Sequence, residues 1–231
     1  MIKKMRFLTS LLLILISSNF YSQSHEIGAG LQNLTNDSAY TSGTWIRNFE
    51  DPTIKGSVYL YENWFTQGII TTKEDKNISI KGLNYETKKD SFVAKISTDS
   101  IYIFNDSNIK EVRINNDRFK KYFNQETNSL SFFQVLAVGK DIEILKLNSK
   151  KIKNGAINPL TQVKEHDKYI NEFTYYLKRG QDIKEIKLKK NAFCRLFTED
   201  SKSINSFISE NNLSLKDERN LQVILNHYNT L

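Results

Sequence analysis

The sequence predicts an α+β fold, in which an antiparallel β-meander (a curved sheet, roll or partial barrel) precedes a C-terminal bundle of about three short helices packed on the sheet. In residues 56–188, short aromatic and β-branched runs alternate with polar turn clusters. From residue 189 to 231 the apolar residues follow helical spacing. We therefore divide the chain into a signal peptide (1–23), an irregular lead-in (24–55), an antiparallel β domain (56–188) and a C-terminal helical segment (189–231).

The N-terminal residues have the three parts of a secretory signal peptide. Lys3, Lys4 and Arg6 form a positively charged start. An apolar run follows at residues 7–16, and small and polar residues occupy 17–24. This run is shorter than the about 20 residues that a membrane-spanning helix needs, so we expect no transmembrane segment after cleavage. The sequence thus predicts an exported protein, located in the periplasm, at the outer membrane or outside the cell.

The composition is that of a globular protein, with 26% charged and 39% hydrophobic residues. The formal net charge of +7 falls to +4 without the signal peptide, which leaves 30 of the 33 basic residues against 26 acidic ones. The excess lies in residues 105–231, with 22 basic and 16 acidic residues. Both signs are mixed along the chain, which predicts a solvated surface, and we expect an exported chain not to bind nucleic acid.

The strands expected in the β domain are short and joined by tight turns, which predicts antiparallel hairpins. They occupy residues 57–61, 68–72, 78–80, 92–96 and 101–104. Residues 130–138 are apolar on both faces, which predicts a central strand. Residues 169–178 alternate between apolar and polar, which predicts a strand with one solvated face.

An internal repeat supports the meander. Gly139–Leu147 and Gly180–Leu188 carry the same residue at five of nine positions, and each copy follows an aromatic run. Glycine tolerates the positive φ that a tight hairpin turn needs. Each copy of the repeat therefore predicts one hairpin.

The helical segment has three apolar stripes that must be buried, and the sheet is the available surface. The stripes are Phe193, Leu196 and Phe197; Ile204, Phe207 and Ile208; and Leu221, Ile224, Leu225 and Tyr228. We expect Thr198 to cap the second helix and residues 214–217 to form a capping box before the last one. The one cysteine, Cys194, lies in an apolar stretch, which predicts a buried and inert thiol.

The sequence shows no cluster of catalytic or metal-ligating residues. Its three histidines, His25, His166 and His227, are far apart in the chain. No zinc motif, nucleophile elbow or glycine-rich phosphate loop occurs. We therefore expect no catalytic, cofactor-binding or metal site, and the sequence favours a protein that is not an enzyme.

A set of aromatic residues forms the candidate lining of a ligand pocket or an interface, and the alternative is that they fill the core. They are Tyr59, Tyr61, Trp64, Tyr102 and Phe104. Glu62 lies beside Trp64, and an acid next to an aromatic residue suits a sugar subsite. Because the neighbouring residues are also aromatic, a core position for Trp64 is the favoured interpretation.

Four motifs of the chain and the end of its signal peptide recur in one known family. They are Gly56-Ser57-x-Tyr59-Leu60-x-x-x-Trp64, Leu83-Asn84-Tyr85, Phe132-Phe133-x-Val135-Leu136, Tyr175-Tyr176 and Tyr21-Ser22-Gln23. Over most of residues 56–229 the chain resembles the exported, signal-bearing β-rich proteins of Bacteroidota, whose activity is not characterised. It departs from many of them at Glu86, where they have asparagine. The resemblance implies a Gram-negative envelope location and assigns no activity, cofactor or site residue.

Three functional hypotheses follow from these observations. The leading one is a non-catalytic interaction or scaffold module of the cell envelope, with an envelope protein complex as its partner. The alternative is a periplasmic binding protein for an apolar or sugar ligand, which predicts an aromatic pocket. The third is a hydrolase that acts on envelope polymers, which predicts two carboxylates facing each other across a cleft.

Overall fold

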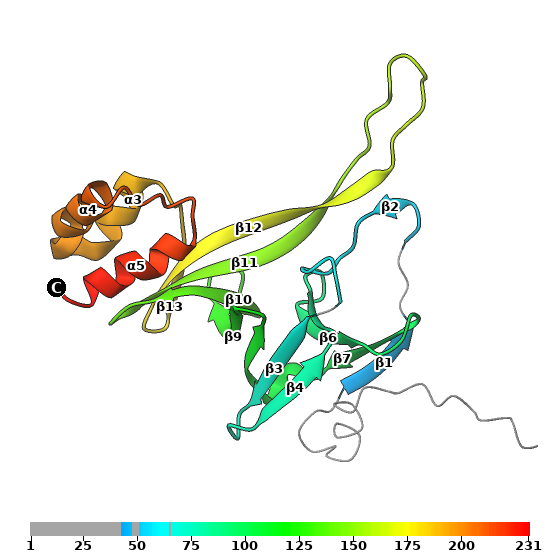
Figure 1. The fold of residues 1–231 in the computed structure, drawn as a ribbon, viewed down its shortest axis with the longest axis horizontal. Coiled ribbons are helices and arrows are strands. Elements are labelled where there is room, and N and C mark those ends of the chain that lie inside the picture. The colour runs from blue at the N-terminus through cyan, green and yellow to red at the C-terminus, as the bar shows by residue number, and fades with distance from the viewer. Residues whose placement is uncertain (1–42, 48–50, 65) are drawn as a thin grey trace, which may run out of the picture.

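The computed structural model describes residues 43–47, 51–64 and 66–231 (Figure 1). The predicted signal peptide, most of the predicted lead-in and His25 lie outside the described residues. Within the described part, the fold is α+β with more sheet than helix, which confirms the sequence prediction at this level. Two β-sheets come first along the chain, and the helices follow them.

The smaller sheet has four strands in the order β1-β7-β6-β5, and every neighbouring pair is antiparallel. Its strands are β1 (Gly43–Arg47), β5 (Leu83–Glu86), β6 (Ser91–Lys95) and β7 (Ser100–Phe104). On the edge strand β1, Trp45 lies opposite Tyr102, with the two ring centres 5.1 Å apart. The lead-in thus contributes an edge strand to this sheet.

The larger sheet has nine strands and runs in the order β13-β12-β11-β10-β9-β8-β3-β4, with β2 paired in parallel beside β12. Its strands are β2 (Ile54–Lys55), β3 (Gln67–Thr72), β4 (Asn77–Lys81), β8 (Ile109–Ile114), β9 (Asp117–Asn124), β10 (Ser129–Val138), β11 (Ile142–Lys153), β12 (Asp167–Arg179) and β13 (Asp182–Ile186). The short 3₁₀ helix η1 (Asp106–Asn108) leads from the smaller sheet into β8. From β8 to β13 the order in space follows the order in sequence, as in a meander.

Both copies of the internal repeat form hairpins, as predicted. Gly139 lies in the β10–β11 connection and Gly180 in the β12–β13 connection, where its φ is 58°. The predicted central strand is β10, which pairs with β9 on one side and β11 on the other. Local turn chemistry and alternation were sufficient to predict this part of the sheet because each hairpin closes within a few residues.

The strand predicted at residues 57–61 is wrong. This segment consists of bends and one isolated bridge between Tyr59 and Glu86. The Leu60 N–H donates to the Tyr85 carbonyl (2.9 Å), but the next N–H, that of Tyr61, donates to the Asn84 side chain (3.1 Å). Because a side-chain amide takes a position that a neighbouring backbone would occupy, no regular ladder forms.

The smaller sheet packs on the end of the larger sheet that contains β3, β4, β8, β9 and β10. Aromatic side chains form the centre of this core. Phe92 of the smaller sheet lies 5.5 Å from Phe119 and 4.8 Å from Phe132 of the larger sheet, between ring centres, and 5.2 Å from Tyr85. All four are essentially inaccessible to solvent. Burial of each such ring stabilises the fold by about 1.5–3 kcal/mol, so this cluster joins the two sheets firmly.

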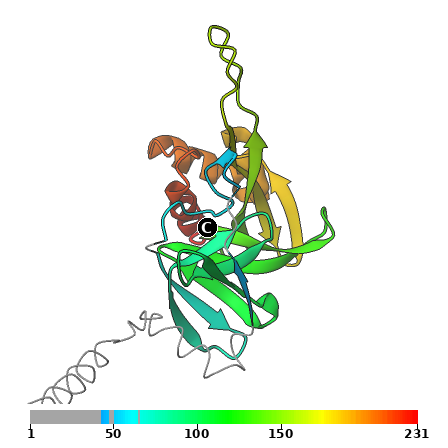
Figure 2. The same ribbon diagram turned by 90° about the vertical axis from the view of Figure 1, so that its right-hand side faces the viewer.

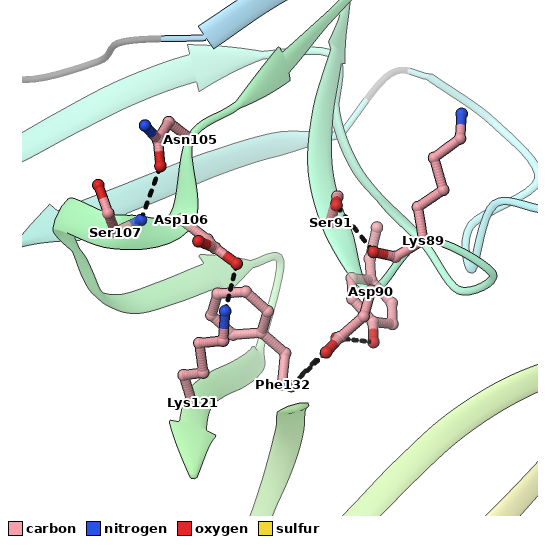
Figure 3. A network of polar contacts seen from close by, with 9 residues as sticks. Lys89, Asp90, Ser91, Asn105, Asp106, Ser107, Lys121 and Phe132 are labelled. Carbon is pink, nitrogen blue, oxygen red and sulfur yellow. Dashed lines mark hydrogen bonds and ion pairs between the residues drawn. The ribbon is translucent and has the colours of Figure 1, made fainter. Parts of the chain in front are cut away.

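Polar contacts also join the two sheets (Figure 3). Asp90, in the β5–β6 turn, accepts the Tyr85 hydroxyl proton at 2.6 Å and the Phe132 N–H at 3.0 Å, both through Oδ1. Lys121 of β9 forms an ion pair with Asp106 of η1, and its ammonium lies 5.1 Å from the centre of the Phe132 ring. Asp90 therefore satisfies a backbone donor of the opposite sheet, which fixes how the sheets are placed.

The C-terminal segment packs on the other end of the larger sheet (Figure 1). It contains α3 (Lys190–Cys194), the 3₁₀ helix η2 (Arg195–Asp200), α4 (Ser201–Glu210) and α5 (Arg219–Tyr228). Their buried side chains form one cluster with Ala137, Ile142 and Ile144 of β10 and β11. Glu218 adds a polar link, since it pairs with Lys146 at 2.9 Å and accepts the Tyr175 hydroxyl proton at 2.7 Å.

Details of the helical segment differ from the sequence prediction. A bundle of three short helices is not confirmed, because α3 has five residues and continues directly into η2. Thr198 does not cap α4, since it has a φ of 47° inside η2. The predicted capping box does not form: the Ser214 hydroxyl accepts the Lys216 N–H at 3.3 Å, and α5 begins only at Arg219. None of the helices in the described ranges is long and apolar enough to cross a membrane.

Candidate functional site

The five candidate aromatic residues are not gathered in one pocket. Tyr102 and Phe104 are buried in the core between the sheets, with their ring centres 5.0 Å apart. Tyr61 is partly buried against the same core, and Tyr59 is buried in a smaller cluster on the other face of the four-stranded sheet. Trp64 is half-buried beside Tyr59 and lines a hollow in the surface, whereas Phe104 borders a separate hollow beside β1.

This hollow, which we call the Trp64 hollow, has a volume of about 430 Å³. Two separate parts of the chain form it, the irregular segment 56–64 and the β11–β12 hairpin. Its lining residues are Gly56, Ser57, Glu62, Trp64, Lys150, Tyr169 and Asn171. Glu62 and Trp64 could be singled out in the sequence because they are close together. The structure adds the amine of Lys150, the amide of Asn171 and the ring of Tyr169.

Register places the three hairpin residues on one face. Lys150 of β11 lies directly opposite Asn171 of β12, and directly opposed residues share a face of the sheet. Tyr169 lies two residues before Asn171 and so points to the same side. This grouping could not be predicted from the sequence, because the three residues meet only through the register of β11 with β12.

The opposite wall is fixed by hydrogen bonds. The Asn84 side chain binds the Tyr61 backbone twice, accepting its N–H at 3.1 Å and donating to its carbonyl at 2.8 Å. The Tyr61 hydroxyl donates to Asp117 at 2.6 Å, and Gln134 donates to the other oxygen of Asp117 at 2.8 Å. Asn148 in turn donates to Gln134 at 3.0 Å. This chain of contacts ties segment 56–64 to β9, β10 and β11, so both walls belong to one framework.

The two charged groups of the hollow have opposite sign. Burial lowers the pKa of Lys150, and the negative charge of Glu62 acts in the opposite direction by favouring the protonated amine. Glu62 is the single carboxylate among the lining residues. The pair of facing carboxylates that a hydrolase requires is therefore not present in this hollow.

Each aromatic wall is supported by groups that do not line the hollow. Tyr59 packs against Trp64 with ring centres 4.6 Å apart, and the Lys95 ammonium lies 5.6 Å from the centre of the Trp64 ring. The Lys88 ammonium lies 4.9 Å from the centre of the Tyr169 ring. Contacts of this kind hold the rings in place and restrict their rotation.

Beyond the hollow, the β11–β12 hairpin projects away from the body of the protein (Figures 1 and 2). We call residues 154–166, which connect the two strands, the hairpin tip. Three of its apolar side chains are largely exposed, with exposed fractions of 62% for Ile157, 93% for Leu160 and 63% for Val163. The sequence predicts a loop around His166 but no interaction site in this segment, although its Asn-Pro turn lies between apolar residues.

The hairpin tip has a defined internal structure. Ile157 and Lys164 form a bridge, and the Asn158 side chain accepts the N–H groups of Leu160 (2.9 Å) and Thr161 (3.2 Å). At the base of the tip, the Gly155 N–H donates to Asp167 at 2.9 Å. These contacts present Leu160 at the outermost turn.

Two lysines lie opposite each other at the last ladder position below the tip, Lys153 and Lys168. Like charges directly opposite each other on an antiparallel pair destabilise it. Nearby, Lys151 pairs with Glu172 and Lys164 with Asp167. Lys153 and Lys168 form no ion pair within the described part of the chain. The end of the hairpin therefore combines exposed apolar side chains in the tip with two opposed lysines directly below it.

The cysteine and the two described histidines lie outside the Trp64 hollow. Cys194 is buried, and burial raises the pKa of its thiol, which disfavours the reactive thiolate. His227 stacks on Phe207 at 3.9 Å, and His166 is exposed in the hairpin tip. No group of three or more metal-ligating side chains occurs in residues 43–47, 51–64 and 66–231.

Comparison of the chain with profiles of protein families, with curated proteins and with solved structures finds no match.

Proposed function

We propose that the protein is an exported, non-catalytic interaction module of the cell envelope, which binds an envelope protein complex through the hairpin tip. The observation that carries the proposal is the exposure of Ile157, Leu160 and Val163 on an element that projects from the fold. Exposed apolar side chains grouped on one feature are typical of interaction sites. The predicted signal peptide and the resemblance to exported proteins of Bacteroidota support the envelope location.

The hairpin suits this role because it joins a stable base to a free end. Its strands pair without interruption from Ile142 opposite Arg179 to Lys153 opposite Lys168. The inner half is embedded in the core, and the outer half is exposed. Because the β11–β12 hairpin is anchored at its base, few of its residues need to become ordered on binding, which favours affinity. The partner should offer an apolar depression for Leu160 and acidic groups near Lys153 and Lys168.

We propose a supporting role for the helical segment 189–231. It would form a helical cap that closes the apolar surface of β10 and β11 and holds the inner half of the hairpin. The cluster of α4 and α5 with Ala137, Ile142 and Ile144 supports this role, and the contact of Glu218 with Lys146 and Tyr175 supports it independently.

Site-specific crosslinking in native envelopes tests the proposed interaction. Leu160→benzoylphenylalanine places a photoreactive group at the outermost turn, and Val223→benzoylphenylalanine provides a matched control on α5, where the apolar side chain is 44% exposed. We expect position 160 to yield one reproducible crosslinked protein and position 223 to yield none. Adding Lys153→Glu to the position-160 variant should reduce the yield. The same products at both positions, or no product at 160, would contradict the proposal.

A further inference from the structure

From the chemistry and geometry of the Trp64 hollow, we infer that it binds a neutral saccharide unit. This site lies at the base of the hairpin and does not depend on the contact proposed for the tip. The observations that carry the inference are its two aromatic walls, its mixed hydrogen-bonding groups and its balanced charge. Each restricts the class of ligand in a different way.

The polar groups match the hydroxyls of a sugar, which both donate and accept hydrogen bonds. Glu62 supplies an acceptor, Lys150 supplies a donor, and Asn171 supplies both. A ligand with several adjacent hydroxyls can satisfy all three groups at once. A purely apolar ligand would leave them without partners, which costs affinity because each loses its contact with water.

The charges indicate that the ligand is neutral. Glu62 and Lys150 have opposite sign and face the same space, so the side chains that line the hollow carry no net charge. An anion would meet the carboxylate of Glu62, and a cation would meet the ammonium of Lys150. Hydrogen bonds from a neutral ligand to these charged groups are stronger than bonds between neutral groups, so the site gains affinity without selecting a charged ligand.

The aromatic walls distinguish a saccharide from a small zwitterion. Trp64 and Tyr169 each contribute an aromatic side chain to the lining, from two different walls. A sugar ring has apolar C–H faces that can pack on such rings, whereas a compact zwitterion would contact only the charged pair. The volume of about 430 Å³ also lies within the range of about 300–1,000 Å³ that is usual for small-molecule sites.

The hollow is already formed without a ligand. Segment 56–64 is fixed by Asn84 and by the chain of contacts from Tyr61 through Asp117 and Gln134 to Asn148. Gly56 lines the hollow with a φ of 85°, which a residue with a side chain rarely adopts, and a Cβ there would lie 3.7 Å from that of Tyr169. Little ordering is therefore left for binding to impose.

The fluorescence of Trp64 provides a direct test. Trp45 lies on β1, outside the hollow, so the full chain carrying Trp45→Phe has Trp64 as its one remaining tryptophan. The probes are glucose, N-acetylglucosamine, maltotriose and chitotriose, with alanine as a zwitterion and acetate as an anion. We expect at least one saccharide to change the emission of Trp64 saturably, and alanine and acetate to leave it unchanged.

Neighbouring lysines provide matched variants. Lys150 lines the hollow, and Lys151 points to the other face of the same strand. Lys150→Met and Asn171→Ala should each weaken binding by about tenfold or more, the loss expected for one hydrogen bond to a ligand. Lys151→Met should leave the affinity unchanged. Thermal melting of each variant shows that it is folded.

Three results would overturn the inference. They are the absence of a saturable response to every saccharide at millimolar concentration, saturation by alanine or acetate instead, and equal affinities in the Lys150→Met and Lys151→Met variants. Crosslinking from position 160 is a separate readout. A failed saccharide titration therefore leaves the proposed role of the tip standing, and a failed crosslink leaves the saccharide site standing.

Discussion

The two halves of the β11–β12 hairpin belong to the same strands, but only one of them is packed into an apolar core. In the inner half, Ile144 is buried under the helices, and Leu145 and Tyr176 are buried against Phe133 on the other face. In the outer half, residues 149–153 and 167–172 have no comparable cover. One continuous ladder therefore passes from a packed core to solvent.

This contrast separates the residues that stabilise the fold from the residues that are available to bind a partner. The inner half has apolar side chains on both faces, whose burial stabilises the fold. The outer half has Lys150, Lys151 and Lys153 on β11 and an exposed apolar tip, so it adds little burial. Substitutions in the inner half should change the free energy of unfolding, whereas substitutions in the outer half should change binding.

The largest effect should come from removing the cover of the inner half. Deletion of residues 214–231 removes four buried side chains of α5, those of Leu221, Ile224, Leu225 and Tyr228. At about 1.5–3 kcal/mol each, the loss is on the order of 6–12 kcal/mol. This is comparable to the whole stability of a typical domain, about 5–15 kcal/mol. Thermal melting measures this loss. We expect the part of the larger sheet that α5 covers to show no cooperative transition in the truncated protein.

A matched change in the outer half is the control for this deletion. Replacing residues 154–166 by a two-residue Asn-Gly turn shortens the hairpin and removes the exposed tip. The melting temperature should stay within a few degrees of that of the full chain. If the shortened hairpin melted as early as the truncated protein, the separation of stability from contact would be wrong.

A second, smaller contrast lies within the single strand β9. Phe119 is fully buried, with ring centres 5.7 Å from Tyr85 and 5.5 Å from Phe92, whereas Phe123 is 47% exposed. Phe119→Ala should lower the free energy of unfolding by about 3–5 kcal/mol. Phe123→Ala should lower it by about 0.5 kcal/mol. Urea unfolding of both variants measures the difference, and similar losses would show that the core between the sheets is not packed as described.

Features that close locally could be predicted from the sequence, and features that depend on distant pairing could not. The repeat at Gly139 and Gly180 predicts its two hairpins because each turn follows from neighbouring residues. The strand expected at 57–61 does not form, because the Asn84 side chain, 23 residues from Tyr61, takes the place of a ladder partner. Alternation and composition do not contain that information.

The candidate site shows the same limit. Glu62 and Trp64 could be noticed because they are neighbours in the sequence. Lys150 and Tyr169 join them only through the register of β11 with β12 and the position of segment 56–64. Conversely, the strands that contain Tyr102 and Phe104 were predicted, but not that the two sheets pack together and bury both rings in their common core.

Substitution of Asp90 should have the next largest effect on the free energy of unfolding, and this effect should depend on pH. Burial raises the pKa of this carboxyl above its ordinary value, although the hydrogen bonds from Tyr85 and Phe132 act in the opposite direction. The folded protein thus holds the proton more tightly than the unfolded chain does. The stability from this group is complete below the ordinary pKa and is lost as the pH rises through the raised value. Chemical unfolding at a series of pH values measures this loss.

Two variants of Asp90 isolate that contribution. Asn accepts a φ near 51°, and its amide oxygen can replace Oδ1 as acceptor for Tyr85 and Phe132. Asp90→Asn should therefore fold and should gain stability relative to the wild type as the pH rises through the raised pKa. Asp90→Ala leaves the Tyr85 hydroxyl unsatisfied and should lose about 2–4 kcal/mol. A difference between wild type and Asp90→Asn that does not vary with pH would contradict this account.

The smallest effect should be a gain in stability at the bare end of the hairpin. Lys153→Glu replaces a pair of like charges, Lys153 and Lys168, with a pair of opposite charges, which should stabilise the ladder by about 0.2–1 kcal/mol. The gain should shrink in high salt because both side chains are exposed. Urea unfolding at low and high salt measures it. The control is Lys151→Glu, which places an acid beside Glu172 and should destabilise the hairpin.

Whether Lys153→Glu stabilises or destabilises the protein is more informative about the outer half of the hairpin than the size of the change. If Lys153→Glu stabilises the protein and also reduces crosslinking from position 160, the outer half keeps a charge arrangement that weakens the fold and serves the partner. That combination separates a contact surface from a surface that is merely solvated, because a solvated lysine can be replaced without loss of binding. If the variant gains stability and crosslinks as before, Lys153 and Lys168 have no part in recognition, and the apolar side chains of the tip alone determine the contact.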